Sequence, residues 1–109
     1  MLTVKRFVLI YHGYGPPTPD FRKRWDEWFR RRAASFADTG HVFGPGRLVT
    51  NDRTIDLSLR SNPASGYSIV NAEHLDAAER LLEGCPIVGS VSLYEALANP
   101  GQPATGANP

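Results

Sequence analysis

Segment 19–40 constrains the fold of this chain more than any other. It holds both tryptophans and three of the five phenylalanines. These aromatic residues recur at spacings of three and four, which place them on one face of a helix, while charged residues occupy the opposite face. The aromatic face comprises Phe21, Trp25, Trp28, Phe29 and Phe36. Because burying an aromatic side chain contributes roughly 1.5–3 kcal/mol, we expect a helix over residues 19–40 that supplies much of the core.

The other elements follow from hydrophobic runs and from turn residues. Strands are predicted at residues 3–12, 41–50, 54–59, 67–71 and 87–97, and a second helix at 72–83. The glycine- and proline-rich loop 13–18 precedes the first helix, and Gly40 is the expected stop after it. One domain is therefore expected over residues 1–97. Residues 98–109 have nothing to bury, and we expect a disordered tail there.

This order of elements, βαββαβ, predicts an α+β fold of ferredoxin-like type with an antiparallel sheet. Right-handed crossovers place both helices on one face of such a sheet. Apolar runs at residues 7–11 and 87–94 indicate that the other face is covered as well, although the chain has no third helix to cover it. We therefore predict a homodimer that packs through the sheet faces.

Charge and composition disfavour several partners. The net charge is +1, which provides no general attraction to nucleic acid or anionic membranes. Acidic residues in the same segment partly neutralise the basic run at residues 30–32, and no exposed aromatic RNA-binding motif lies beside it. We therefore interpret this run as a solvent-exposed helix face. Cys85 is the single cysteine, and neither a signal peptide nor an apolar stretch of about 20 residues is present, which predicts a cytoplasmic protein without a membrane span.

Chemistry-bearing residues are few. One cysteine and three scattered histidines lack metal-ligand spacing, so neither a metal nor a cofactor is predicted. His12 ends the first predicted strand and His41 follows the predicted helix, near Asp38. A carboxylate can orient a histidine ring and raise its basicity. The plainer interpretations remain open: His12 bonds to the loop backbone, and His41 lies at a solvated helix end.

Three blocks of sequence carry a family pattern: the opening VKRFVLIYHG, the segment FADTG with the following Gly44-Pro45-Gly46, and GYSIVNAEHLDAAERLLEGCP with the exit GSVSLYEA. Together they resemble the bacterial YCII-related domain family over about residues 4–97. The resemblance implies a dimeric α+β barrel of ferredoxin-like type, and most members of that family have no assigned function.

Some members of the family pair a histidine on the first helix with an aspartate near its end. Asp38 matches that aspartate, whereas Trp28 and Phe29 occupy the region of the histidine. An Asp-Gly-Pro-Phe motif of another branch is replaced by the residues at 62–65, Asn-Pro-Ala-Ser. The family's catalytic pairs are therefore incomplete in this chain.

These observations favour a homodimeric domain that binds a small organic molecule and does not catalyse a reaction. The expected pocket lies between sheet and helix and is bordered by Tyr11, His12, Trp28, Asp38, Gly44 and Tyr67. The alternative is an acid–base lyase or isomerase acting on a small organic substrate. In that case His12 or His41 would act together with Asp38.

Overall fold

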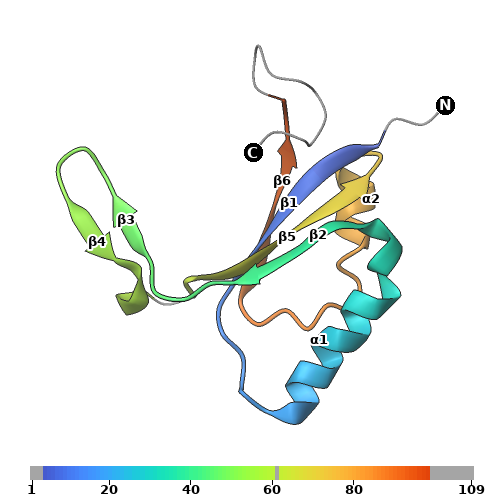
Figure 1. Ribbon diagram of the computed structural model, residues 1–109, viewed down its shortest axis with the longest axis horizontal. Helices are drawn as coiled ribbons and strands as arrows, with labels where there is room; N and C mark the ends of the chain where they lie inside the picture. The colour runs from blue at the N-terminus through green and yellow to red at the C-terminus, as the bar shows by residue number, and fades with distance from the viewer. Residues whose placement is uncertain (1–3, 61, 99–109) are drawn as a thin grey trace.

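The structure is a computed structural model that describes residues 4–60 and 62–98. Four strands form one antiparallel sheet in the order β2-β5-β1-β6, with two helices against it (Figure 1). The elements are β1 (Lys5–His12), α1 (Pro19–Arg31), β2 (Phe36–Val42), β5 (Ala64–Ala72), α2 (Leu75–Arg80) and β6 (Ser90–Ala96). This small α+β architecture is compatible with the predicted ferredoxin-like fold. No helix in the described part of the chain is long and apolar enough to cross a membrane.

A hairpin extends the chain between β2 and β5. Its strands are β3 (Arg47–Val49) and β4 (Thr54–Asp56), which pair only with each other and project away from the main sheet (Figure 1). The predicted strand 54–59 is too long, because a 3₁₀ turn, η2 (Leu57–Leu59), begins where β4 ends. The Asp56 carboxylate caps this turn by accepting bonds from the backbone and hydroxyl of Ser58, at 2.9 and 2.7 Å. These bonds lower the pKa of Asp56.

The helix predicted for residues 19–40 is wrong in its second half. Its start is confirmed, since Thr18 Oγ1 accepts a bond from the backbone N–H of Phe21, but α1 ends at Arg31. A 3₁₀ turn, η1 (Ala33–Ser35), leads into β2. Phe36 still reaches the aromatic cluster, from a strand, with its ring 5.5 Å from that of Trp28. Helical spacing could not reveal this, because pairing with β5 satisfies the backbone of this segment through residues about 30 positions away.

Gly40 therefore lies inside a strand and does not end a helix. Its φ is +81°, and the register of β2 with β5 shifts between Asp38 and His41, the interval that contains Gly40. A Cβ at Gly40 would lie 1.7 Å from the carbonyl oxygen of Tyr67. Glycine is thus needed here for close approach of two strands, a role that leaves no periodic signal in the sequence.

The second helix is shorter than predicted. It spans Leu75–Arg80 instead of residues 72–83, because β5 continues to Ala72. The N-cap is His74, whose Nδ1 accepts a bond from the backbone N–H of Ala77 at 3.1 Å. The last strand likewise begins at Ser90 and not at residue 87. Apart from Ala98, the predicted tail lies outside the described residues.

The core lies between the helices and one face of the sheet. Its fully buried apolar residues are Phe7, Leu9, Trp28, Val70 and Ala78. Alternation along β1 separates the two faces: Phe7 and Leu9 are buried under the helices, whereas Val8 and Ile10 are half-buried on the opposite face. Both helices lie on the same side of the sheet (Figure 1). The described helices therefore leave the Val8 face uncovered.

Candidate functional site

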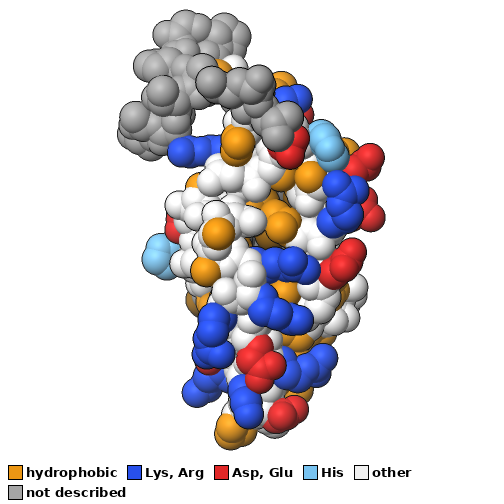
Figure 2. Space-filling model, turned by 90° about the vertical axis from the view of Figure 1, so that its right-hand side faces the viewer, with side chains coloured by type: hydrophobic (Ala, Val, Ile, Leu, Met, Phe, Trp, Pro, Cys, Tyr) orange, Lys and Arg blue, Asp and Glu red, His pale blue; other side chains and the backbone are white. Residues whose placement is uncertain are grey.

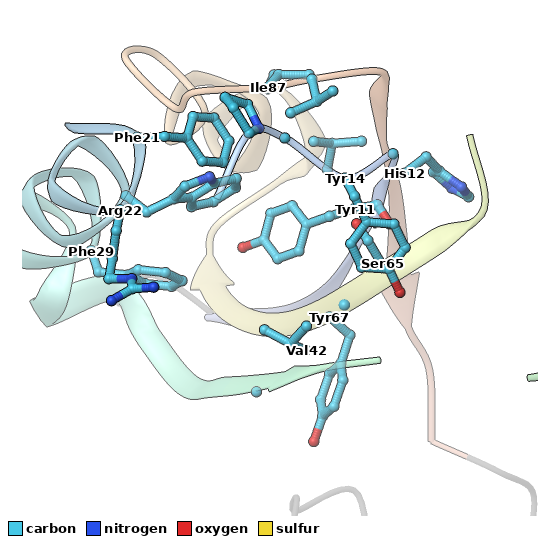
Figure 3. A pocket seen from close by; sticks show the side chains of 18 of the residues that line it. Tyr11, His12, Tyr14, Phe21, Arg22, Phe29, Val42, Ser65, Tyr67 and Ile87 are labelled. Carbon is cyan, nitrogen blue, oxygen red and sulfur yellow. The ribbon is translucent and has the colours of Figure 1, made fainter. Parts of the chain in front are cut away.

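A cavity of about 610 Å³ lies between the start of α1, the loop 13–18 and the sheet (Figure 3). Its lining is mainly aromatic and aliphatic. The larger apolar side chains are Tyr11, Tyr14, Phe21, Trp25, Phe29, Val42, Tyr67, Ile87, Val88 and Val91. Small-molecule sites in proteins are apolar clefts of roughly 300–1,000 Å³ with a few polar groups. In size and lining, this cavity has the character of a small-molecule site.

The loop 13–18 forms one wall of the cavity, and its glycines determine how closely it packs. Gly13 has φ +92°, and its N–H donates to the carbonyl of Pro63 at 2.8 Å. A Cβ at Gly15 would lie 2.3 Å from the ring of Phe21, so only glycine allows the backbone to lie against that ring. The following prolines restrict the chain on its way into α1. The wall is therefore built from local constraints in the loop itself.

Tyr11 occupies the middle of the cavity view (Figure 3). Its hydroxyl donates to Ser68 Oγ at 2.8 Å, and the buried Ser68 hydroxyl donates in turn to the carbonyl of Thr39 at 2.7 Å. The Tyr11 ring packs edge-to-face on Trp25, with centroids 5.1 Å apart. Burial raises the pKa of Tyr11 well above its ordinary value, outweighing the opposite effect of the Ser68 bond. Tyr11 is therefore a neutral, fixed part of the wall.

Tyr14 connects the loop to the segment after β2. Its hydroxyl donates to the carbonyl of Phe43 at 2.6 Å, although 54% of the side chain is exposed. The ring of Phe43 stacks on that of Tyr67, with centroids 5.9 Å apart. This contact joins the two chain segments at the edge of the cavity. Opening the site on that side would break a hydrogen bond.

The structure brings some of the predicted site residues to the cavity and leaves others away from it. Tyr11, His12, His41 and Tyr67 belong to the lining, although the Tyr67 ring points away from the cavity, on the face of the sheet that also carries Ile10 (Figure 3). Trp28 lies in the core behind the cavity, where its Nε1–H donates to the carbonyl of Leu81 at 3.0 Å. Asp38 and Gly44 are also outside the lining, and a Cβ at Gly44 would meet only open space.

His12 and Asp38 lie far apart in the sheet. His12 pairs with Ala64 of β5, whereas Asp38 on β2 pairs with Ile69. Five residues along β5 correspond to roughly 17 Å, with the width of a strand in addition. His12 Nε2 lies 3.0 Å from Ser92 Oγ, and the His12 ring points away from Tyr11 (Figure 3).

Asp38 interacts with Tyr67 and with its own strand. One carboxylate oxygen accepts from the Gly40 N–H at 2.8 Å, and the other accepts from the Tyr67 hydroxyl at 3.3 Å. Partial burial and the nearby Asp38 charge raise the pKa of Tyr67. The His41 ring lies beside Tyr67, with centroids 6.1 Å apart. Across residues 4–60 and 62–98, no hydrogen bond joins either of these histidine rings to Asp38.

Sequence reasoning missed the cavity side of α1. Phe21, Trp25 and Phe29 follow one another at intervals of four and form a single stripe on that helix. This stripe lines the cavity, whereas Trp28 faces the core. Dividing the aromatic face into two stripes would have predicted the lining. Tyr14 and Arg22 gave no comparable signal.

Other chemistry is sparse in the described residues. Over that part of the chain, no group of three or more His, Cys, Asp or Glu side chains is arranged to hold a metal ion. Cys85 is half-buried, and burial raises the pKa of its thiol to about 12. The chain matches no family model, no curated protein and no solved structure.

Proposed function

We propose that this protein binds a small, largely apolar organic molecule in the aromatic cavity without catalysing a reaction on it. The cavity itself carries the proposal: about 610 Å³ lined by five aromatic side chains from β1, the loop and α1, namely Tyr11, Tyr14, Phe21, Trp25 and Phe29. Rings that are held in place by packing offer contact area to a ligand at little cost in conformational entropy. The single cysteine favours a cytoplasmic setting.

A binding role is favoured over acid–base catalysis by the state of the polar groups. The lyase or isomerase alternative requires His12 or His41 to act together with Asp38. In the described residues Asp38 bonds Tyr67 and Gly40, while the His12 ring bonds Ser92. Tyr11 is the central hydroxyl of the cavity, but its proton is committed to Ser68 and its raised pKa disfavours the phenolate. Neither His12 nor Tyr11 is arranged as a base directed at a ligand, and among the described residues no hydrogen bond joins the His41 ring to Asp38.

We also propose that a second copy of the chain covers the open face of the sheet. That face presents Val8, Ile10 and Ile69, all half-buried, with Tyr94 63% exposed beside them. Exposed apolar patches of this kind commonly mark interfaces. A dimeric α+β barrel, as the resemblance to the YCII-related family implies, would bury it. Analytical ultracentrifugation should show a dimer at micromolar concentration that Tyr94→Arg weakens, and a stable wild-type monomer would refute this part.

The ligand site is tested with N-phenylnaphthylamine, a neutral dye that fluoresces in apolar surroundings. The wild-type protein should bind about one dye per chain, saturably. Ile87→Trp fills space at the cavity, since Ile87 lines it and is 44% exposed. We expect this variant to weaken dye binding by about tenfold or more through overpacking.

Val49→Trp is the matched control, because Val49 is 72% exposed on the hairpin and does not line the cavity. It should bind the dye like the wild type. If Ile87→Trp also binds like the wild type, the dye lies elsewhere and the cavity is not the site. If the wild-type protein does not bind the dye, the proposed function fails.

A further inference from the structure

We infer that the ligand is an organic acid, an apolar ring or chain carrying one anionic group that Arg22 binds. This inference rests on the proposed function and adds the chemical class of the ligand. Among the described residues that line the cavity, Arg22 is the one with a permanent charge, and none is Asp or Glu. A neutral apolar ligand would not need a cation there, whereas an anion would be repelled by an acidic lining. The charge of the cavity is thus matched to an acid.

The position of Arg22 allows it to contact a bound molecule at the rim. It belongs to the first turn of α1, directly after Phe21, which packs against the loop. Its side chain lies beside Phe29 on the α1 side of the cavity, opposite Tyr14 and Ser65 (Figure 3). An apolar body resting against Tyr11 and Trp25 could therefore direct its acid group toward the guanidinium. A guanidinium group binds carboxylates and sulfonates through two parallel hydrogen bonds.

Arg22 is also available for this role. The ion pair found in the described residues is Lys5–Glu95, with a separation of 3.9 Å, so Arg22 has no acidic partner among them. Its side chain is exposed. A guanidinium without a protein partner next to an apolar cavity can gain a charge-assisted bond from a ligand without breaking an existing one.

Three hydroxyl groups of the cavity lining, those of Tyr11, Tyr14 and Ser65, are already engaged as donors. The Tyr11 hydroxyl donates to Ser68, and the Tyr14 hydroxyl donates to Phe43. The Ser65 hydroxyl donates to the carbonyl of Tyr11 at 3.2 Å. An anion entering the cavity would find lone pairs at these oxygens, not free protons. Arg22 differs from the remaining polar residues of the lining in its permanent charge, so the charge-assisted bond that an anion needs would come from its guanidinium.

The net positive charge of α1 also favours an anionic ligand. Helix α1 contains five basic and three acidic residues. Figure 2 shows Lys and Arg side chains gathered over the lower half of the face that α1 forms, with Asp and Glu side chains between them. A modest positive potential at the entrance raises the local concentration of anions. It does not distinguish one anion from another, so selectivity has to come from the apolar cavity.

The test compares two dyes that share one ring system: neutral N-phenylnaphthylamine and anilinonaphthalene sulfonate, which adds one sulfonate. Arg22→Gln removes the charge at the rim. Arg24→Gln is the matched control, since Arg24 is exposed on the same helix and does not line the cavity. We expect Arg22→Gln to weaken the sulfonate dye by about two- to fivefold, as for an exposed ion pair, and to leave the neutral dye unchanged. Arg24→Gln should change neither dye, and added salt should reduce the effect of Arg22.

The outcomes separate this inference from the proposed function. If the neutral dye binds in the cavity but Arg22→Gln leaves the sulfonate dye unaffected, the ligand site stands and the acid class is refuted. If Arg22→Gln and Arg24→Gln weaken the sulfonate dye equally, the effect is general charge and the inference is also overturned. If neither dye binds the wild-type protein, the proposed function itself fails.

Discussion

Replacing Trp28 with phenylalanine tests how the core supports the site. Trp28 is fully buried on α1, and its indole N–H donates to the carbonyl of Leu81 after α2. The substitution removes two ring carbons, worth about 0.8 kcal/mol each on burial. It also leaves the part-buried Leu81 carbonyl without its partner, at a cost of about 1–3 kcal/mol. Together these effects should reduce the free energy of unfolding by about 3–4 kcal/mol, a large share of the stability of a domain this size.

The assay is equilibrium unfolding in urea at a fixed protein concentration, because dimerisation would make the midpoint depend on concentration. Trp25→Phe is the internal control. Trp25 lies on the same helix and loses the same atoms, but it is only half-buried and makes no indole hydrogen bond with the described residues. We expect this variant to lose about 1 kcal/mol. If the free energy of unfolding falls no further in the Trp28 variant than in the Trp25 variant, the indole bond of Trp28 to Leu81 does not stabilise the packing of α1 on the α2 region.

Three further predictions follow from single positions. Gly40→Ala should lower the free energy of unfolding by about 3 kcal/mol or more, or prevent folding, because the new Cβ would meet the Tyr67 carbonyl. Gly44→Ala should change the free energy of unfolding by no more than about 0.5 kcal/mol, and thermal unfolding measures both variants. Cys85, with a pKa of about 12 against an ordinary 9.0, should react with iodoacetamide more than about tenfold more slowly in the folded than in the unfolded protein at about pH 8.5, because less of the thiol is ionised. Since its raised pKa favours the thiol in the folded state, this contribution to stability is present below pH 9 and is lost as the pH rises toward 12. Asp38→Asn should lower the pKa of Tyr67, measured by ultraviolet titration of the phenolate, and an unchanged pKa would contradict the role assigned to the Asp38 charge.

Local signals predicted a substantial part of the fold. The glycine- and proline-rich loop 13–18 marked the start of α1, and the apolar run at residues 7–11 marked β1. The spacing of Phe21, Trp25 and Trp28 placed the aromatic side of that helix correctly. Each of these features depends on residues within a few positions of one another. Caps, periods and turns carry such information directly in the sequence.

The candidate site was predicted only in part, for a different physical reason. Tyr11 and Tyr67 were expected at a ligand pocket, and both belong to the lining of the cavity, although only the Tyr11 ring is directed into it (Figure 3). The expected association of His12 with Asp38 requires two strands to be neighbours, but β5 lies between them. Sheet order is decided by which strands pair across long sequence separations, and no local pattern reports it.

The sequence by itself therefore determined the amphipathic helix, the main strands and the α+β class, because these follow from local propensity and the alternation of apolar residues. The tertiary structure alone decided that residues 36–42 form a strand, since its hydrogen bonds come from β5. It also decided where the cavity lies. The cavity forms only when the sheet brings together the aromatic stripe of α1, the loop 13–18 and the ends of the strands. The sequence alone therefore could not show that Arg22 lies at a cavity.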